Sequence, residues 1–154
     1  MIPAEQRIRL CRVLLILNLL FIWGNSMLPG ELSGAFSDWV KELLMRFLPV
    51  GSMEQPESGG LLRKMAHFTE FMSLGLLLAW LLVMRRRSGG MALIWGATAA
   101  CIDETIQIFV PQRGPSLRDV GIDTLGVITG IILLRLGYLL WKRKQIKQYG
   151  GNSQ

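Results

Sequence analysis

Ionisable residues are concentrated in one stretch, "DETIQIFVPQRGPSLRDVGID", which runs from Asp103 to Asp123 and carries four acids and two arginines. It lies between two uncharged stretches, Met91–Ile102 and Leu125–Leu134. Ionisable groups at the edge of such apolar segments cost free energy unless they are paired or hydrated. Their presence therefore indicates a function, which could be binding of a charged ligand or acid–base catalysis.

Further ionisable groups, Lys64, His67 and Glu70, come at the start of an earlier apolar segment. We expect Glu70, Asp103, Glu104 and Asp123 to belong to three membrane helices. At 1.5 Å per residue, each of these acids lies about 7–10 Å from the end of its helix that faces the outside of the cell. We therefore expect one polar site that opens to the outside. The predicted ligand-binding residues are Lys64, His67, Glu70, Asp103, Glu104, Gln107, Arg113, Asp119 and Asp123.

Two kinds of chemistry fit these residue types. Lys64, His67 and Arg113 would donate hydrogen bonds to an anionic head group such as phosphate. Alternatively, His67 with Asp119 or Asp103 would form a general base and its orienting acid, so these three residues are the catalytic candidates. Because no serine or cysteine lies in a recognisable nucleophile motif, water or a substrate hydroxyl would have to attack.

No cofactor and no resident metal is predicted. A divalent cation is an alternative, and its ligands would be His67, Glu70, Asp103 and Asp119. Purely structural roles also compete for single residues. Lys64 and Arg118 could extend to the membrane boundary, and Gln107 could join two helices.

Long apolar helices are predicted to carry these polar groups. Hydrophobic residues make up 51% of the 154 residues and come in long blocks. A helix needs roughly 20 mainly apolar residues to cross a bilayer. The predicted fold is an all-α integral membrane protein of one domain, residues 1–154, with four transmembrane helices and a short outer interfacial amphipathic helix. The predicted spans are 12–29, 63–84, 90–110 and 119–141.

The connection of residues 31–62 is predicted to lie outside. Its segment Phe36–Leu48 has apolar residues at three- and four-residue spacing, which favours an amphipathic helix in the membrane interface. Ser37 is the expected N-cap, and Pro49 follows the predicted end. The stretch Gly51–Gly60 is expected to be a flexible loop.

The net charge of +6 indicates orientation and excludes nucleic acid as the expected partner. With a cytoplasmic N-terminus, most basic residues fall on the inner side, where Glu5 is the one acid. Both termini are therefore predicted to be cytoplasmic in the cell membrane. Cys11 and Cys101 lie at different depths, so no disulfide is expected.

The pair Gly126 and Gly130 forms a GxxxG motif in the last predicted span. Such a motif lets another helix approach closely. Packing within the chain is the favoured interpretation, and a homodimer through these glycines is the alternative.

Three motifs together resemble the VanZ-like family, named for an accessory membrane protein associated with teicoplanin resistance. They are K-x-x-H-F at Lys64–Phe68, D-E-x-x-Q-x-F-x-P-x-R-x-x-x-x-x-D from Asp103 to Asp119, and Asp123-x-x-Gly126 with Gly130. Ser26 and Pro29 add a weaker similarity. An asparagine usually follows the last Asp of the family pattern by four residues, and here Asp123 takes that place.

The resemblance implies a role in reducing glycopeptide antibiotic action at the cell surface. The favoured hypothesis is a binding protein for an amphiphilic ligand, either a lipid-linked cell-wall (peptidoglycan) precursor or a lipoglycopeptide. A membrane-embedded hydrolase or transferase acting on a lipid-linked head group is the second hypothesis. The third is a structural partner of the cell-wall synthesis machinery. Membrane lipids are the expected surroundings in each case.

Overall fold

A computed structural model describes residues 3–47 and 58–150. These residues form five α-helices and contain no strand, which confirms the all-α prediction. The helices are α1 (Ala4–Ser26), α2 (Gly30–Phe47), α3 (Ser58–Met84), α4 (Gly90–Gln107) and α5 (Leu117–Gly150).

Three of the described helices are long and apolar enough to cross a membrane, over Ala4–Ser26, Gly60–Met84 and Leu117–Ile146. The helix α4 is shorter, and the polar residues Asp103, Glu104 and Gln107 occupy its last turns. They lower the mean hydropathy of α4. This explains why α4 is not among these three helices, although residues 90–110 were predicted to span the membrane.

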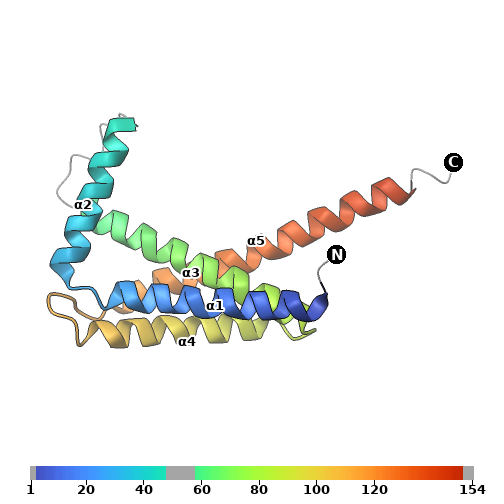
Figure 1. The fold of residues 1–154 in the computed structure, drawn as a ribbon, viewed down its shortest axis with the longest axis horizontal. Coiled ribbons are helices and arrows are strands. Elements are labelled where there is room, and N and C mark those ends of the chain that lie inside the picture. The colour runs from blue at the N-terminus through green and yellow to red at the C-terminus, as the bar shows by residue number, and fades with distance from the viewer. Residues whose placement is uncertain (1–2, 48–57, 151–154) are drawn as a thin grey trace.

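The helices α1 and α4 run in one direction and α3 and α5 in the opposite direction, so α1 begins on the side of the molecule where α5 ends (Figure 1). The connections from α1 to α2 and from α4 to α5 lie together at the other end, which we call the junction end. Leu15, Ile22, Phe71, Leu74 and Val127 belong to the hydrophobic core. Many large apolar side chains point outward, as expected of helices whose solvent is lipid.

The closest helix packing joins α3 to α5 through glycines. A Cβ atom on Gly126 would lie 2.5 Å from the carbonyl oxygen of Phe68, and one on Gly130 would lie 2.7 Å from the amide nitrogen of Leu76. On α3, a Cβ on Gly75 would collide with the Val127 backbone. The GxxxG motif therefore packs within the chain, and a homodimer through it stays a prediction.

The helix α2 begins earlier than its apolar pattern predicted. It starts at Gly30, directly after Pro29, and the Ser33 amide donates to the Pro29 carbonyl oxygen over 3.1 Å. The N-cap prediction for Ser37 was therefore wrong, because Ser37 lies inside the helix. The predicted end at Leu48 and Pro49 lies outside the described residues.

Other boundaries also differ from the expected ones. The helix α3 already includes Ser58–Gly60, which were predicted to belong to a loop, while residues 51–57 lie outside the described part. The helix α1 extends back to Ala4, where Glu5 and Arg9 form an i,i+4 pair of 4.0 Å. The helix α5 continues past the predicted end at Trp141 to Gly150, because charged residues can continue a helix where an apolar pattern stops.

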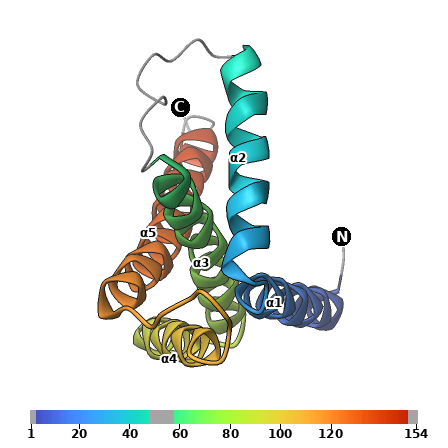
Figure 2. The same cartoon turned by 90° about the vertical axis from the view of Figure 1, so that its left-hand side faces the viewer.

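The direction of α2 differs from that of the other helices. It leaves the junction end across the long direction of α1 and α4 (Figures 1 and 2). Leu32, Trp39 and Leu43 follow one another at helical spacing and are exposed. The helix therefore presents an apolar face that does not belong to the core.

Candidate polar binding site

Polar side chains from four elements meet near the junction end. They come from the end of α1, the first turns of α3, the end of α4 and the start of α5. The chain reverses at these points, so residues far apart in the sequence lie at one level. The predicted site residues of α3, α4 and α5 all belong to this region.

Asp103 is at the centre of the site. It is fully buried, and its Oδ2 accepts hydrogen bonds from Ser26 Oγ at 2.8 Å and from Gln107 Nε2 at 2.9 Å. The first bond joins α1 to α4, and the second spans one turn of α4. Asp103 Oδ1 is buried and has no hydrogen-bond partner. One carboxylate oxygen is thus held in place while the other can receive a ligand.

Glu104 uses its side chain in another direction. Its Oε2 accepts a 2.7 Å hydrogen bond from the Ser116 amide. Ser116 Oγ in turn accepts from the Asp119 amide at 3.3 Å and so caps the start of α5. Asp103 therefore contacts α1 while the adjacent Glu104 supports the start of α5.

Glu70 and His67 form the α3 side of the site. Asn25 Nδ2 donates to Glu70 Oε1 at 2.9 Å, and His67 Nδ1 lies 3.7 Å from Glu70 Oε2. The second distance is too long for a hydrogen bond. Both His67 Nδ1 and Glu70 Oε2 are buried without a hydrogen-bond partner. Each of these two residues therefore still has an unsatisfied polar atom.

The connection from α4 to α5 packs against the connection from α1 to α2. The Gly30 amide donates to the Pro111 carbonyl oxygen at 3.3 Å, and Gln112 Nε2 donates to Glu31 Oε1 at 2.6 Å. Gln112 has a φ of 62°, in the left-handed region. These contacts fix the connection that carries Arg113.

Arg113 points toward α1. Its Nη2 donates to the Asn25 carbonyl oxygen at 3.4 Å, and its buried Nε and Nη1 have no hydrogen-bond partner. Burial lowers the pKa of the Arg113 guanidinium, and the nearby charge of Arg63 acts in the same direction. Asp103, Glu104 and Glu70 oppose this shift.

A pocket of about 10 Å³ lies among these groups, which is the room that roughly one water molecule needs. Its lining includes two basic residues, Arg63 and Lys64. Lys64 Nζ lies 3.9 Å from Asp119 Oδ1, and about a third of each side chain is exposed. The complete lining is Arg63, Lys64, His67, Glu104, Gln107, Asp119, Ile122 and Asp123.

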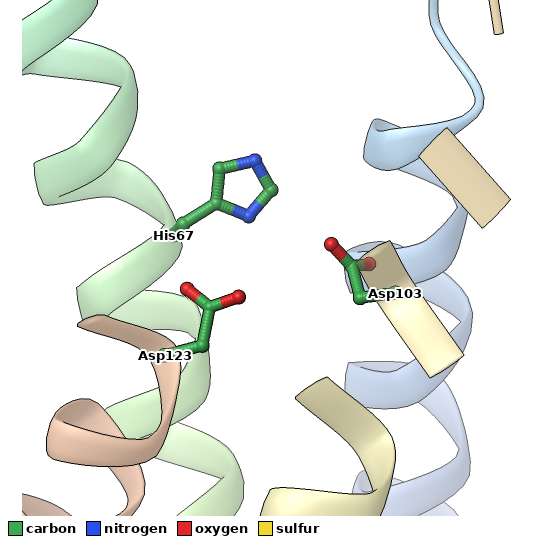
Figure 3. A group of neighbouring side chains, drawn as sticks. All are labelled: His67, Asp103 and Asp123. Carbon is green, nitrogen blue, oxygen red and sulfur yellow. The ribbon is translucent and has the colours of Figure 1, made fainter. Parts of the chain in front are cut away.

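His67, Asp103 and Asp123 each direct a polar atom into the same space. Figure 3 shows the imidazole and the two carboxylates facing one another from α3, α4 and α5. One ligand atom from each lies within 4.8 Å of the other two. These three residues could hold a metal ion together. The fourfold set proposed from the sequence included Glu70 and Asp119 in place of Asp123.

The structure brings the nine predicted site residues to one region, but it assigns them different contacts. Lys64 pairs with Asp119, so the described contacts give His67 no direct bond to Asp119. Sequence reasoning missed Arg63, which lines the pocket, and Asn25, which bonds Glu70. The polar pair Asn25-Ser26 at the end of the first apolar block was the available signal for the α1 contribution.

The fold and the site define a class: an all-helical protein with three described helices long and apolar enough to span a membrane and a buried polar cluster at the end where its helices reverse. The chain matches the VanZ/LLP1 family over residues 12–141 and belongs to that family. No curated protein and no solved structure matches the chain.

Proposed function

We propose that this VanZ-like protein binds the polar head of an amphiphilic ligand at the outer face of the membrane and thereby reduces glycopeptide antibiotic action. The ligand is a lipid-linked cell-wall precursor or a lipoglycopeptide. The observation that carries the proposal is a set of buried polar atoms without a hydrogen-bond partner, four of which belong to residues that line one narrow pocket. The atoms are His67 Nδ1, Glu70 Oε2, Asp103 Oδ1, Glu104 Oε1, Arg113 Nε and Nη1, Asp119 Oδ1 and Asp123 Oδ1.

Buried polar atoms in folded proteins normally have hydrogen-bond partners, and each exception needs an explanation. A bound ligand supplies one, because it satisfies several atoms at the same time. The pocket itself holds little more than one water-sized particle, so a large head group would sit at its mouth. Arg63 and Lys64 stand among the lining residues and suit the anionic part of such a head group.

The proposed topology has four spans, with both termini in the cytoplasm. The alternating directions of α1, α3, α4 and α5 support four crossings, because α4 connects the end of α3 to the level at which α5 begins (Figure 1). Basic residues at the start of α1 and the end of α5 favour the cytoplasmic side for those ends. The junction end then faces outward.

In this topology α2 lies along the outer membrane surface. Its direction across α1 and its exposed apolar face support that placement. A helix in this position would guide an amphiphile whose tail remains in the bilayer. The proposal also accounts for Trp39, since tryptophan favours the membrane interface.

The test is teicoplanin susceptibility of bacteria that express the protein, together with mass spectrometry of lipids that co-purify with it. Arg63→Gln and Lys64→Gln should each reduce protection and lipid retention, because both remove a positive charge from the pocket lining. Asp38→Asn on α2 is the control, since Asp38 is exposed and belongs to no part of the site. Unchanged protection in both site variants at equal membrane levels would reject the proposal.

An enzyme is the second candidate, and the convergence of His67, Asp103 and Asp123 favours it. Such a group could activate water against a lipid-linked head group. Purified protein would then convert a lipid-linked precursor to a new product, and His67→Ala would abolish turnover. Stoichiometric binding without product would support the binding protein instead.

An assembly role makes a different prediction. A structural partner of the wall-synthesis machinery would tolerate changes in the polar site and lose function when the exposed face of α2 is altered. Comparing Lys64→Gln with Leu43→Glu in the same susceptibility assay separates the two roles.

A further inference from the structure

Two buried carboxylates in the site have no basic partner within ion-pair distance among residues 3–47 and 58–150. Asp103 is 0% exposed and Asp123 is 2% exposed. Lys64 pairs with Asp119 instead. The charge of Arg113 acts on Asp103 from beyond ion-pair distance, and the hydrogen bond that Arg113 donates goes to the Asn25 carbonyl oxygen. A buried ionised carboxylate costs several kcal/mol unless an opposite charge compensates it.

The two carboxylates face a common space. Asp103 Oδ1 and Asp123 Oδ1 are both buried and lack hydrogen-bond partners. His67 adds its buried, unsatisfied Nδ1. The three residues come from three helices, and one ligand atom of each lies within 4.8 Å of the others (Figure 3). Ligand atoms of three residues within 4.8 Å of one another, two of them from buried carboxylates, indicate a small ligand of positive charge.

We propose that His67, Asp103 and Asp123 bind one divalent metal ion of the Zn²⁺ or Mn²⁺ class. An imidazole nitrogen suits zinc and other transition ions, while carboxylates also suit manganese. A neutral histidine with two carboxylates has a charge of −2, so a divalent ion makes the group neutral inside the protein. Ligand atoms that hold zinc at about 2.1 Å lie roughly 3.4 Å apart in tetrahedral geometry. The three side chains therefore close by about 1 Å or a little more when the ion binds.

The surrounding contacts fit a metal centre. Ser26 and Gln107 both donate to Asp103 Oδ2, which fixes the carboxylate and leaves Oδ1 for the ion. Hydrogen bonds of this kind orient metal ligands in proteins. The adjacent pocket, at about 10 Å³, has room for roughly one water as a further ligand. Gln107 and Asp123 line that pocket, so the ion would be reachable from it.

This inference rests on the same site as the proposed function and deepens it. A metal ion beside the pocket would attract an anionic head group, such as a phosphate, that Arg63 and Lys64 contact from the other side. The ion would also be able to polarise a bound water or a phosphoryl oxygen. Metal binding by itself can be measured without any lipid or antibiotic.

The experiment uses the full chain without an affinity tag, purified in detergent and freed of metal with a chelator. Zinc binding is followed by titration calorimetry and by elemental analysis after desalting, and Mn²⁺ by loss of its free electron paramagnetic resonance signal. The wild type should bind one ion per chain, and the ion should raise its melting temperature. His67→Gln and Asp123→Asn should each weaken binding at least tenfold and remove the thermal shift.

Two controls keep the result interpretable. Asp38→Asn makes the same chemical change at an exposed acid of α2, outside the site, and should bind the ion like the wild type. Circular dichroism of the metal-free variants should match that of the wild type, and Asp123→Asn is preferred to Asp103→Asn because Asp123 forms no described hydrogen bond to another helix. Failure to bind either ion, or equal binding by wild type and Asp123→Asn, would overturn the inference.

The outcome is separable from that of the proposed function. Wild-type protein that binds no ion but still protects against teicoplanin would reject the metal centre and leave the ligand site in place. Stoichiometric metal binding, with protection that does not depend on Arg63 or Lys64, would keep the metal centre and reject the proposed function. The alternative to a metal ion is a proton that the carboxylates of Asp103 and Asp123 share. A failure of the wild type to bind metal would favour this alternative.

Discussion

Ser26 Oγ donates a 2.8 Å hydrogen bond to Asp103 Oδ2 across 77 positions of sequence. Both residues are buried, and the bond joins the last residue of α1 to the last turns of α4. It fixes Asp103 at the level where the chain reverses. A carboxylate that would otherwise be an isolated buried charge thus becomes a positioned member of the site.

Removing the Ser26 hydroxyl should destabilise the protein. Ser26→Ala leaves Asp103 Oδ2 with one donor, Gln107, in place of two. The loss of a buried hydrogen bond costs about 1–3 kcal/mol. We expect a lower midpoint in denaturant unfolding of the purified protein. Ser88→Ala is the matched control, because it removes an exposed hydrogen bond, from the Gly90 amide to Ser88 Oγ at 3.3 Å, in place of a buried one. Equal midpoints for the two variants would mean that the Ser26 bond contributes nothing to stability.

Gly130→Leu should damage folding before it affects any ligand. A side chain at this position would collide with Met72 and Leu76 on α3. Overpacking of a tight interface costs about 1–3 kcal/mol and often more when backbone must move. Gly137→Leu is the control on the same helix, because a Cβ there meets nothing within 4 Å. Thermal unfolding in detergent should separate them, and equal melting temperatures would contradict the packing described for α3 and α5.

The Lys64–Asp119 pair should matter for function more than for stability. The side chains are 34% and 30% exposed, and such pairs contribute about 1 kcal/mol or less. Asp119→Asn should therefore shift the unfolding free energy by less than about 1 kcal/mol while protection against teicoplanin falls. A variant that unfolds readily yet retains protection would show that the pair is structural.

The proposed orientation predicts which positions are accessible from each side of the membrane. In a background without Cys11 and Cys101, Gly114→Cys should react with an impermeant thiol reagent on intact cells. Ser88→Cys should react only after the membrane is opened. Both positions are exposed, and a Cβ at Gly114 meets no neighbour. The reverse labelling pattern would invert the topology and place the polar site on the cytoplasmic side.

The sequence alone determined the helical class and the separation of polar from apolar segments. Long uncharged blocks can satisfy their backbone groups in lipid only as helices or closed barrels, and their length favours helices. The same logic placed Glu70, Asp103 and Asp123 near one level, because depth along a helix follows from residue number. The family motifs lie on those same residues, and the family match agrees with them.

The contacts between particular polar groups depend on the tertiary structure. Depth does not fix the rotation of one helix against another, and that rotation decides whether His67 meets Glu70, Asp103 or Asp119. It placed Asp123 beside His67 and Asp103, and it left Asp119 with Lys64. The contribution of Asn25 and Ser26 likewise depends on how α1 packs. Helix packing through Gly75, Gly126 and Gly130 sets the rotation of α3 against α5, because close backbone contact allows few alternative arrangements.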